Sequence, residues 1–200
     1  MKTNKTVSIS YLTVTAMMGA LSFVLQLLEF PIPFLIPEFI KFDFSDLPAL
    51  ISSFSLGPVS GVLVCLIKNV LHLTVSTTGG VGELANFLLS ACFAGVAGLV
   101  YKYRKTKSGA LLGSLLGALF MGLASVPLNL YLTYPFYYNF IPQEAILAAY
   151  QAIIPSVDHI VTCLWVFNFP FNLLKSLVIT LITFLIYKHI SPLLKGKKGK

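Results

Sequence analysis

The stretch KFDFSDLPALISSFSLGPVSGVLVCLIKNVLH, residues 41–72, combines two strongly apolar segments with charged and amide side chains. Gly57 and Pro58 predict a turn that separates the segments. We expect a short helix over about 44–56 and a second helix over about 59–76. Two apolar helices joined by a turn without charge indicate a helical hairpin inside a membrane.

The polar residues of this hairpin need a structural or functional reason. Ser45 or Asp46 is suited to cap the first helix, since both side chains accept hydrogen bonds from free backbone N–H groups. Lys68 and His72 are four residues apart in the second helix, so they share a face. A lysine in lipid is costly, and Lys175, well inside the last apolar segment, is therefore expected to face the bundle interior and to have a partner there.

The whole chain has the composition of an integral membrane protein. Its 200 residues are 56% hydrophobic and 10% charged, whereas soluble domains have about 25% charged residues. A helix needs about 20 apolar residues to cross the hydrocarbon layer. We predict one all-α domain, residues 1–200, with six transmembrane helices at about 7–28, 44–56 (short), 59–76, 82–101, 109–133 and 160–187.

The charged residues predict the orientation of these helices. The formal net charge is +7. Six transmembrane helices would place three segments, the two termini and the connection at about 102–107, on the same side of the membrane. These segments contain 11 of the 14 basic residues: Lys2, Lys5, Lys102, Arg104, Lys105, Lys107, Lys188, Lys195, Lys197, Lys198 and Lys200. The positive-inside rule makes that side cytoplasmic, with both termini inside. We interpret the basic tail as meeting anionic lipid and expect no nucleic-acid partner.

Two outer connections have unusual composition. Residues 29–40 contain Pro31, Pro33 and Pro37 and cannot be helical throughout, yet they are apolar. They form either a lid over a pocket or a loop lying on the lipid surface. In the last outer connection, residues 142–155 predict a short amphipathic helix at the interface.

The first helix has a face of small residues. Ala16 and Ala20 form a small-xxx-small pattern, which permits another helix to approach closely. The pattern taken alone favours packing inside the protein.

Polar residues recur in four of the predicted helices, mostly toward their outer ends. The set comprises Lys68, Asn69, His72, Glu83, Asn86, Asn129, Asn168, Asn172 and Lys175. Amides and a few charges among aromatic rings suit a flat heteroaromatic ligand that carries hydroxyl groups. Ion conduction would need polar groups through both halves of the bundle, and the cytoplasmic halves are apolar.

Several short motifs together carry a family resemblance: Lys41-Phe-Asp-Phe-Ser-Asp-Leu-Pro-Ala-Leu, Gly57-Pro58-x-x-Gly61 with Lys68-Asn69, Gly82-Glu83-Leu-Ala-Asn86, and Asn172-x-x-Lys175. With these motifs the chain resembles the substrate-binding S components of energy-coupling-factor (ECF) vitamin transporters, and most closely the riboflavin-specific type. The resemblance covers nearly the whole chain.

The resemblance implies a ligand, its contacts and its partners. Riboflavin, or its phosphate, would lie in the outer half under the residue 29–40 lid, in contact with Phe39, Asn69, Glu83, Asn86, Asn129, Asn172 and Lys175. Ala16 and Ala20 would dock on the transmembrane T component, and two cytoplasmic ATPase subunits would complete the transporter in the bacterial plasma membrane. No catalytic residue, cofactor or metal is implied.

Other functions fit the sequence less well. A membrane-embedded enzyme would need a nucleophile or metal cluster, but the chain has no HExxH motif, no paired cysteines and three dispersed histidines. A self-sufficient carrier or channel would be supported by an inverted repeat, and the sequence shows no convincing one. An ATPase would need a GxxxxGK[ST] phosphate-binding loop, which the sequence does not contain. Within the family, thiamine or folate are alternative ligands: the thiamine cation would favour acidic groups, and folate would favour further basic ones.

Overall fold

The structure, a computed structural model, describes residues 8–194, and the side chains of residues 8–186. The terminal lysines that contributed to the predicted orientation, Lys2 and Lys5 at one end and Lys195, Lys197, Lys198 and Lys200 at the other, lie outside the described residues. The side chain of Lys188 does as well.

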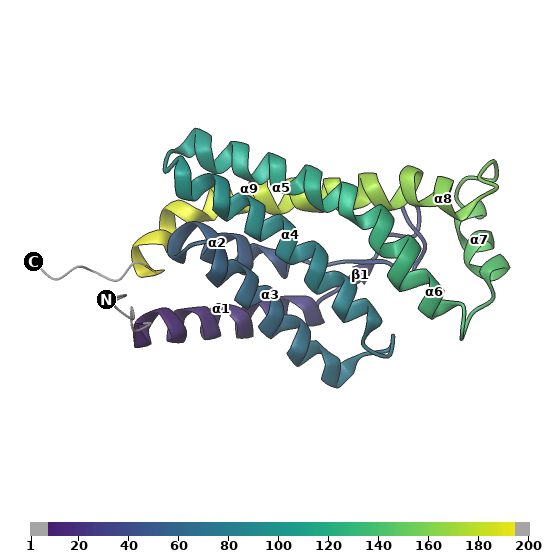
Figure 1. The fold of residues 1–200 in the computed structure, drawn as a ribbon, viewed down its shortest axis with the longest axis horizontal. Coiled ribbons are helices and arrows are strands. Elements are labelled where there is room, and N and C mark those ends of the chain that lie inside the picture. The colour runs from purple at the N-terminus through teal and green to yellow at the C-terminus, as the bar shows by residue number, and fades with distance from the viewer. Residues whose placement is uncertain (1–7, 195–200) are drawn as a thin grey trace, which may run out of the picture.

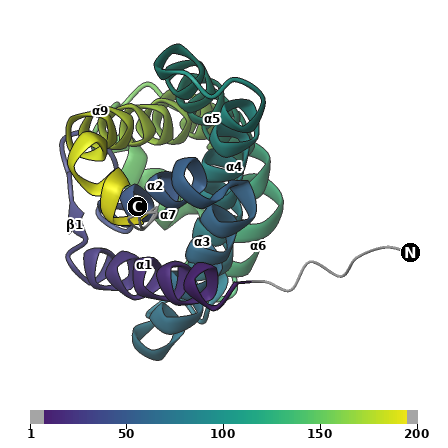
Figure 2. The same ribbon diagram turned by 90° about the vertical axis from the view of Figure 1, so that its left-hand side faces the viewer.

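Long helices form a bundle around a buried centre (Figures 1 and 2). They are α1 (Ile9–Leu27), α3 (Pro58–His72), α4 (Val81–Tyr103), α5 (Lys107–Leu128) and α9 (Phe169–Leu194). α4 packs against α5 and α3, α3 packs against α1, and α5 packs against α9. Within the described residues, 5 helical stretches are long and apolar enough to cross a membrane.

The central element is α2 (Asp46–Leu56), which packs against α1, α3, α4 and α9. Residues 48–54 are all buried, and Figure 2 shows α2 surrounded by the other helices. Its 11 residues extend only about 17 Å at 1.5 Å per residue. The segment predicted as a short second span is therefore a helix enclosed by protein.

The start of α2 partly differs from the expected cap. Ser45 occupies the capping position, but its side chain makes no capping hydrogen bond. Its hydroxyl instead donates to Asp43 Oδ1 and accepts from Lys68 Nζ at 2.6 Å. The turn to α3 requires Gly57, because its φ of 107° is one that side-chain-bearing residues rarely adopt.

Two helices are interrupted by π-helical turns. Residues 129–133 continue α5 into α6 (Tyr134–Tyr137), so this helix extends beyond the predicted end at 133. Pro135 lies just after the π-helical turn, where the regular hydrogen-bond pattern of the helix is already interrupted. Residues 164–168 likewise join α8 (Ile160–Cys163) to α9.

One end of the bundle carries the irregular segments. The short strands β1 (Phe30–Pro31) and β2 (Lys41–Phe42) pair antiparallel and close the loop that contains most of the lid segment, residues 29–40. A turn of 3-10 helix (Leu73–Val75) follows α3, and the predicted outer helix is present as α7 (Gln143–Gln151). Figure 1 shows β1, α6 and α7 toward this end, whereas α1 begins, α9 ends and α4 joins α5 at the other.

Candidate functional site

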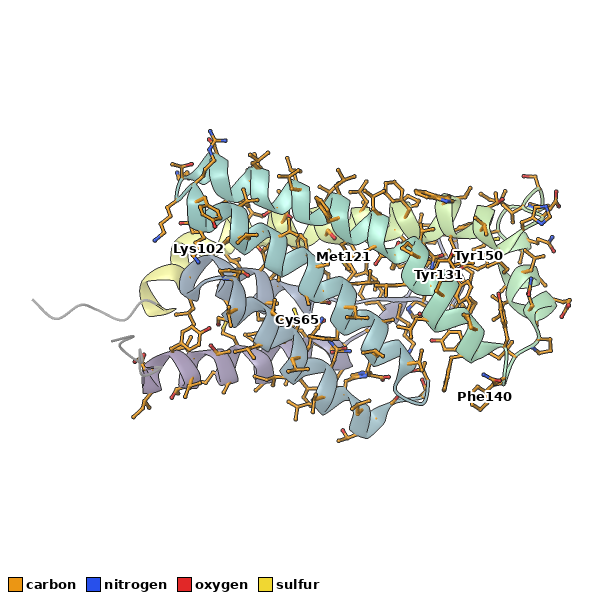
Figure 3. The ribbon with its side chains drawn as sticks, viewed as in Figure 1. Cys65, Lys102, Met121, Tyr131, Phe140 and Tyr150 are labelled. Atoms are coloured by element: carbon orange, nitrogen blue, oxygen red, sulfur yellow. The ribbon has the colours of Figure 1, made fainter. Side chains whose placement is uncertain are left out.

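A cavity of about 190 Å³ lies in the half of the bundle nearest β1 and α6. Figure 3 labels Met121, which lines it, between Lys102 at one end of the molecule and Tyr150 toward the other. The polar and aromatic lining comes from α1, the lid segment and its flanks, α3, α4, the two π-helical turns, α6 and α9, and includes Gln26, Phe39, Asp43, His72, Glu83, Asn86, Asn129, Tyr134, Tyr137, Asn168, Phe171, Asn172 and Lys175.

Most residues predicted as substrate contacts line this cavity: Phe39, Glu83, Asn86, Asn129, Asn172 and Lys175. Asn69 is not among the lining residues. Its amide nitrogen donates to Cys65 O at 2.8 Å, and its Oδ1 accepts from Gln26 Nε2 at 3.4 Å. Asn69 therefore lies behind Gln26, which is the amide that reaches the lining.

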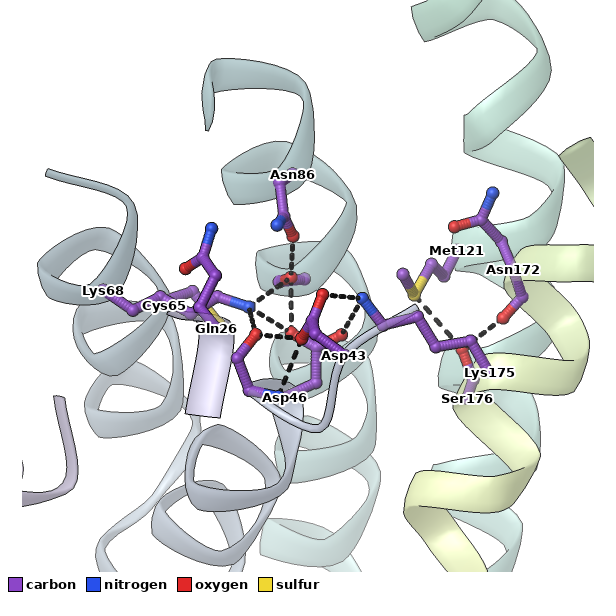
Figure 4. A network of polar contacts seen from close by, with 12 residues as sticks. Gln26, Asp43, Asp46, Cys65, Lys68, Asn86, Met121, Asn172, Lys175 and Ser176 are labelled. Atoms are coloured by element: carbon purple, nitrogen blue, oxygen red, sulfur yellow. Dashed lines mark hydrogen bonds and ion pairs between the residues drawn. The ribbon is translucent and has the colours of Figure 1, made fainter. Parts of the chain in front are cut away.

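Two buried lysines pair with two buried aspartates (Figure 4), and Asp43 and Lys175 of this cluster line the cavity. Lys68 Nζ lies 2.6 Å from Asp46 Oδ1, and Lys175 Nζ lies 2.8 Å from Asp43 Oδ2 and 3.6 Å from Asp46 Oδ2. Removing one partner of such a buried pair leaves an uncompensated charge. The predicted need of Lys175 for a partner is thus met by residues next to and within α2.

Asp43 connects this cluster to the lid segment, because it directly follows β2. Burial raises the pKa of its carboxyl group, and the ammonium groups of Lys175 and Lys68 lower that pKa by more, so the net direction is downward. The carboxylate is therefore the form that the site stabilises, and it remains an acceptor for Lys175.

A second polar cluster lies where α3 approaches the start of α4. His72 Nδ1 lies 3.0 Å from Glu83 Oε1, while Ser76 Oγ and Thr78 Oγ1 donate to Glu83 Oε2 at 2.8 and 3.0 Å. Glu83 is 6% exposed. Its position in the first turn of α4 suits the helix dipole, but these side-chain contacts fix the carboxylate at the cavity wall.

The amides of the cavity are held in defined orientations. The Asn86 amide lies 2.9 Å from Ser90 Oγ, whose hydroxyl also lies 2.5 Å from Asp46 Oδ1. The amide nitrogens of Asn129 and Asn172 donate to Ser125 O and Asn168 O at 2.7 and 2.8 Å. Their amide oxygens remain as acceptors, and the wall therefore offers both donors and acceptors to a ligand.

Comparison with known proteins gives the family. A model of the family "ECF transporter, substrate-specific component" matches residues 10–187. This chain belongs to that family of transporter subunits. This S component is consequently not an enzyme.

Similar proteins match it over almost their whole length. The S component is 34% identical over 180 residues to "Riboflavin transporter RibU" of Staphylococcus aureus (strain TCH60), covering 90% of this chain and 89% of that protein. It is 32% identical over 193 residues to "Riboflavin transporter FmnP" of Bacillus subtilis (strain 168), covering 94% and 95%. A solved structure, "Structure and mechanism of the S component of a bacterial ECF transporter", matches with a TM-score of 0.72 and 31% identity, covering 93% and 98%.

Sequence reasoning missed several residues that line the cavity of the S component. Gln26 lies within the first apolar helix, where a lone amide is unusual enough to have indicated it. Asp43 belongs to the residue 41–50 motif, but its place in the sequence does not indicate a position in the cavity wall. The predicted helix at about 109–133 ends before α6, because the continuation of α5 into α6 was not predicted. Three lining residues therefore lie at or beyond that predicted end: Thr133, Tyr134 and Tyr137.

The two alanines of the S component predicted to meet a partner are exposed on α1. The internally packed face carries Thr15 and Gly19 instead: Thr15 is 3% exposed and bonds to Ser60, and Gly19 adjoins Ile67 of α3. Internal packing, which the pattern alone favoured for Ala16 and Ala20, is therefore wrong.

Proposed function

We propose that this S component binds riboflavin in the cavity beneath the lid segment and delivers it to an ATP-driven ECF transporter in the bacterial cell membrane. The support comes from family membership and from relatives that are named riboflavin transporters. The observation that carries the proposal is the charge balance of the cavity wall.

Each carboxylate and each ammonium group that lines the cavity has a polar partner within the protein. Lys41 pairs with Glu29 at 2.5 Å, Lys175 pairs with Asp43, and Glu83 accepts from neighbouring side chains. A charged ligand would compete with these contacts in a site of low dielectric. A neutral ligand such as riboflavin suits the wall better than the thiamine cation or the folate anion.

The amides and aromatic rings account for the shape of the ligand. In the proposal, Glu83, Asn129, Asn172 and Lys175 hydrogen-bond the ring edge and the ribityl hydroxyls, as the family resemblance implies. Asn86 adds a further amide group, and the Phe39 ring of the lid segment covers the flat ring system. Asn69 acts through Gln26 and does not touch the ligand.

We propose six membrane-embedded helices, with α2 as the short enclosed one, and both termini in the cytoplasm. The connection from α4 to α5, which contains Lys105, lies at the end where α1 begins and α9 ends (Figure 1), and Lys102 in the last turn of α4 lies there as well (Figure 3). The positive-inside rule makes that end cytoplasmic and the cavity extracellular. The lid segment then covers a site that loads from outside.

The exposed alanines of α1 are proposed as the surface for the T component, and two ATPase subunits complete the transporter. Ala16 and Ala20 leave room for a close helix–helix approach, and the residues beside them, Thr15 and Gly19, already pack inside the bundle. No other role for the exposed alanines is evident in the described part of the chain.

The proposal is tested with purified protein in detergent. Its absorption spectrum is recorded, and riboflavin is titrated while flavin fluorescence is followed. A yellow preparation, or saturable quenching at one site per chain, is expected. Riboflavin phosphate, thiamine and folate are titrated in parallel, and tighter binding of thiamine or folate would overturn the assignment of riboflavin.

A further inference from the structure

Tyr150 lies behind the cavity and contacts three residues that line it. It belongs to α7, in the connection between α6 and α8, and it is 0% exposed. Its hydroxyl donates to Asn168 Oδ1 at 2.7 Å and hydrogen-bonds the hydroxyl of Tyr134. Its ring meets that of Phe39 edge-on, with the centroids 6.0 Å apart. Tyr150 itself is not among the lining residues.

The hydrogen bond from Tyr150 determines what Asn168 offers to a ligand. Asn168 is 2% exposed and lines the cavity. Because its amide oxygen is directed at Tyr150, its N–H groups are what remains for the cavity. Without the Tyr150 hydroxyl, the amide could rotate and present its oxygen instead, which would face a ligand carbonyl with the wrong group.

The ring of Tyr150 fixes a second part of the wall. Phe39 belongs to the lid segment, and Phe167 lies in the π-helical turn before α9 with its ring centroid 5.0 Å from that of Tyr150. One buried side chain thus joins the lid segment, α7 and the start of α9.

We propose that Tyr150 is a positioning residue of the ligand site, which fixes the amide of Asn168 as a hydrogen-bond donor toward a carbonyl or ring nitrogen of the ligand and packs against Phe39. This inference rests on the proposed function, riboflavin binding.

The test measures riboflavin affinity in the wild-type chain, Tyr150→Phe, Asn168→Ala and the double variant. Tyr150→Phe keeps the ring contacts and removes only the hydroxyl. We expect about tenfold weaker binding, which is the size of one well-placed hydrogen bond. The double variant should bind no more weakly than Asn168→Ala alone, since Tyr150 acts through that amide. Tyr131→Phe, at a side chain that is 78% exposed, is the matched control and should keep wild-type affinity.

The outcomes separate this inference from the proposed function. Wild-type affinity in Tyr150→Phe, or losses that multiply in the double variant, would overturn the positioning role alone. Absence of riboflavin binding by the wild-type chain would overturn both. If Tyr150→Phe cannot be purified as a folded protein, Asn168→Ala carries the test: about tenfold weaker binding supports the inference, and unchanged binding overturns it.

Discussion

Some ligand-binding residues of the cavity also hold the site together, whereas others do not. Asn172 uses one N–H group to bond Asn168 O and has its amide oxygen left for the cavity. Lys175, three residues later, is engaged by Asp43 and Asp46. Substitution at these two neighbouring positions should therefore have different consequences.

We expect Asn172→Ala to weaken riboflavin binding about tenfold, since a buried hydrogen-bond partner of the ligand is lost. The apparent melting temperature should stay close to that of the wild type, because the bond to Asn168 O is local. Fluorescence titration and thermal unfolding measure the two effects. Asn139→Ala, at an exposed amide outside the cavity, is the control. Unchanged affinity of Asn172→Ala would remove this residue from the site.

Lys175→Met should destabilise the protein strongly, by about 3–5 kcal/mol, because it leaves Asp43 buried without its closest cation. The double variant Asp43→Asn/Lys175→Met should recover much of the apparent melting temperature, since neither charge then remains unpaired. Thermal unfolding of the two single variants and the double variant gives the comparison. Additive losses would show that the two residues stabilise the protein independently.

At the scale of elements, α2 can lie at the centre of the bundle because its neighbours approach it closely. A Cβ atom at Gly98 of α4 would lie 2.6 Å from Ser53 Oγ of α2 and 2.9 Å from Pro58 Cα. Three residues earlier in the same helix, a Cβ atom at Gly95 would lie 3.4 Å from a Val62 methyl group. A methyl group added at Gly98 would therefore collide with a backbone atom of α3, whereas one added at Gly95 would make an ordinary van der Waals contact.

Gly98→Ala should lower stability by about 1–3 kcal/mol through overpacking against backbone. Gly95→Ala is the matched control on the same helix, and it should be neutral or stabilising by up to about 1 kcal/mol, because alanine favours helix. Thermal unfolding of both variants, without ligand, tests the difference. Equal stability of the two would contradict the close approach of α2, α3 and α4.

For the whole molecule, the exposed face of α1 and the orientation in the membrane connect binding to transport. Ala16→Trp should leave riboflavin affinity unchanged and abolish uptake by the complete transporter, because a large side chain prevents close docking. Binding is measured on the purified chain and uptake in cells. Leu181→Trp, at a 63% exposed position of α9, should preserve both. Normal uptake with Ala16→Trp would exclude this face as the docking surface.

The orientation has its own test. Lys105→Cys, in the α4–α5 connection, should react with a membrane-impermeant thiol reagent only from the cytoplasmic side. Cys65 and Cys163 are buried, and the same chain without the new cysteine gives the background labelling. Reaction from outside intact cells would invert the proposed topology.

Composition and local pattern determined the class of this protein. The long apolar runs predicted the helices that the structure contains, since in lipid a chain must satisfy its backbone hydrogen bonds within itself. The short motifs at residues 41–50, 82–86 and 172–175 indicated the family. Intramembrane amides and charges indicated a site because they are costly without partners, and Phe39, Glu83, Asn86, Asn129, Asn172 and Lys175 do line one cavity.

The tertiary structure decided what each of these residues contacts. The sequence places Lys175 132 residues from Asp43, and nothing local indicates that they pair. In the same way, only the fold reveals that Asn69 lies behind Gln26, that Ala16 faces outward, and that Tyr150 reaches Asn168 from α7. Local pattern depends on the chain's own spacing, whereas these contacts depend on how separate helices pack, and packing is set by all of their side chains together.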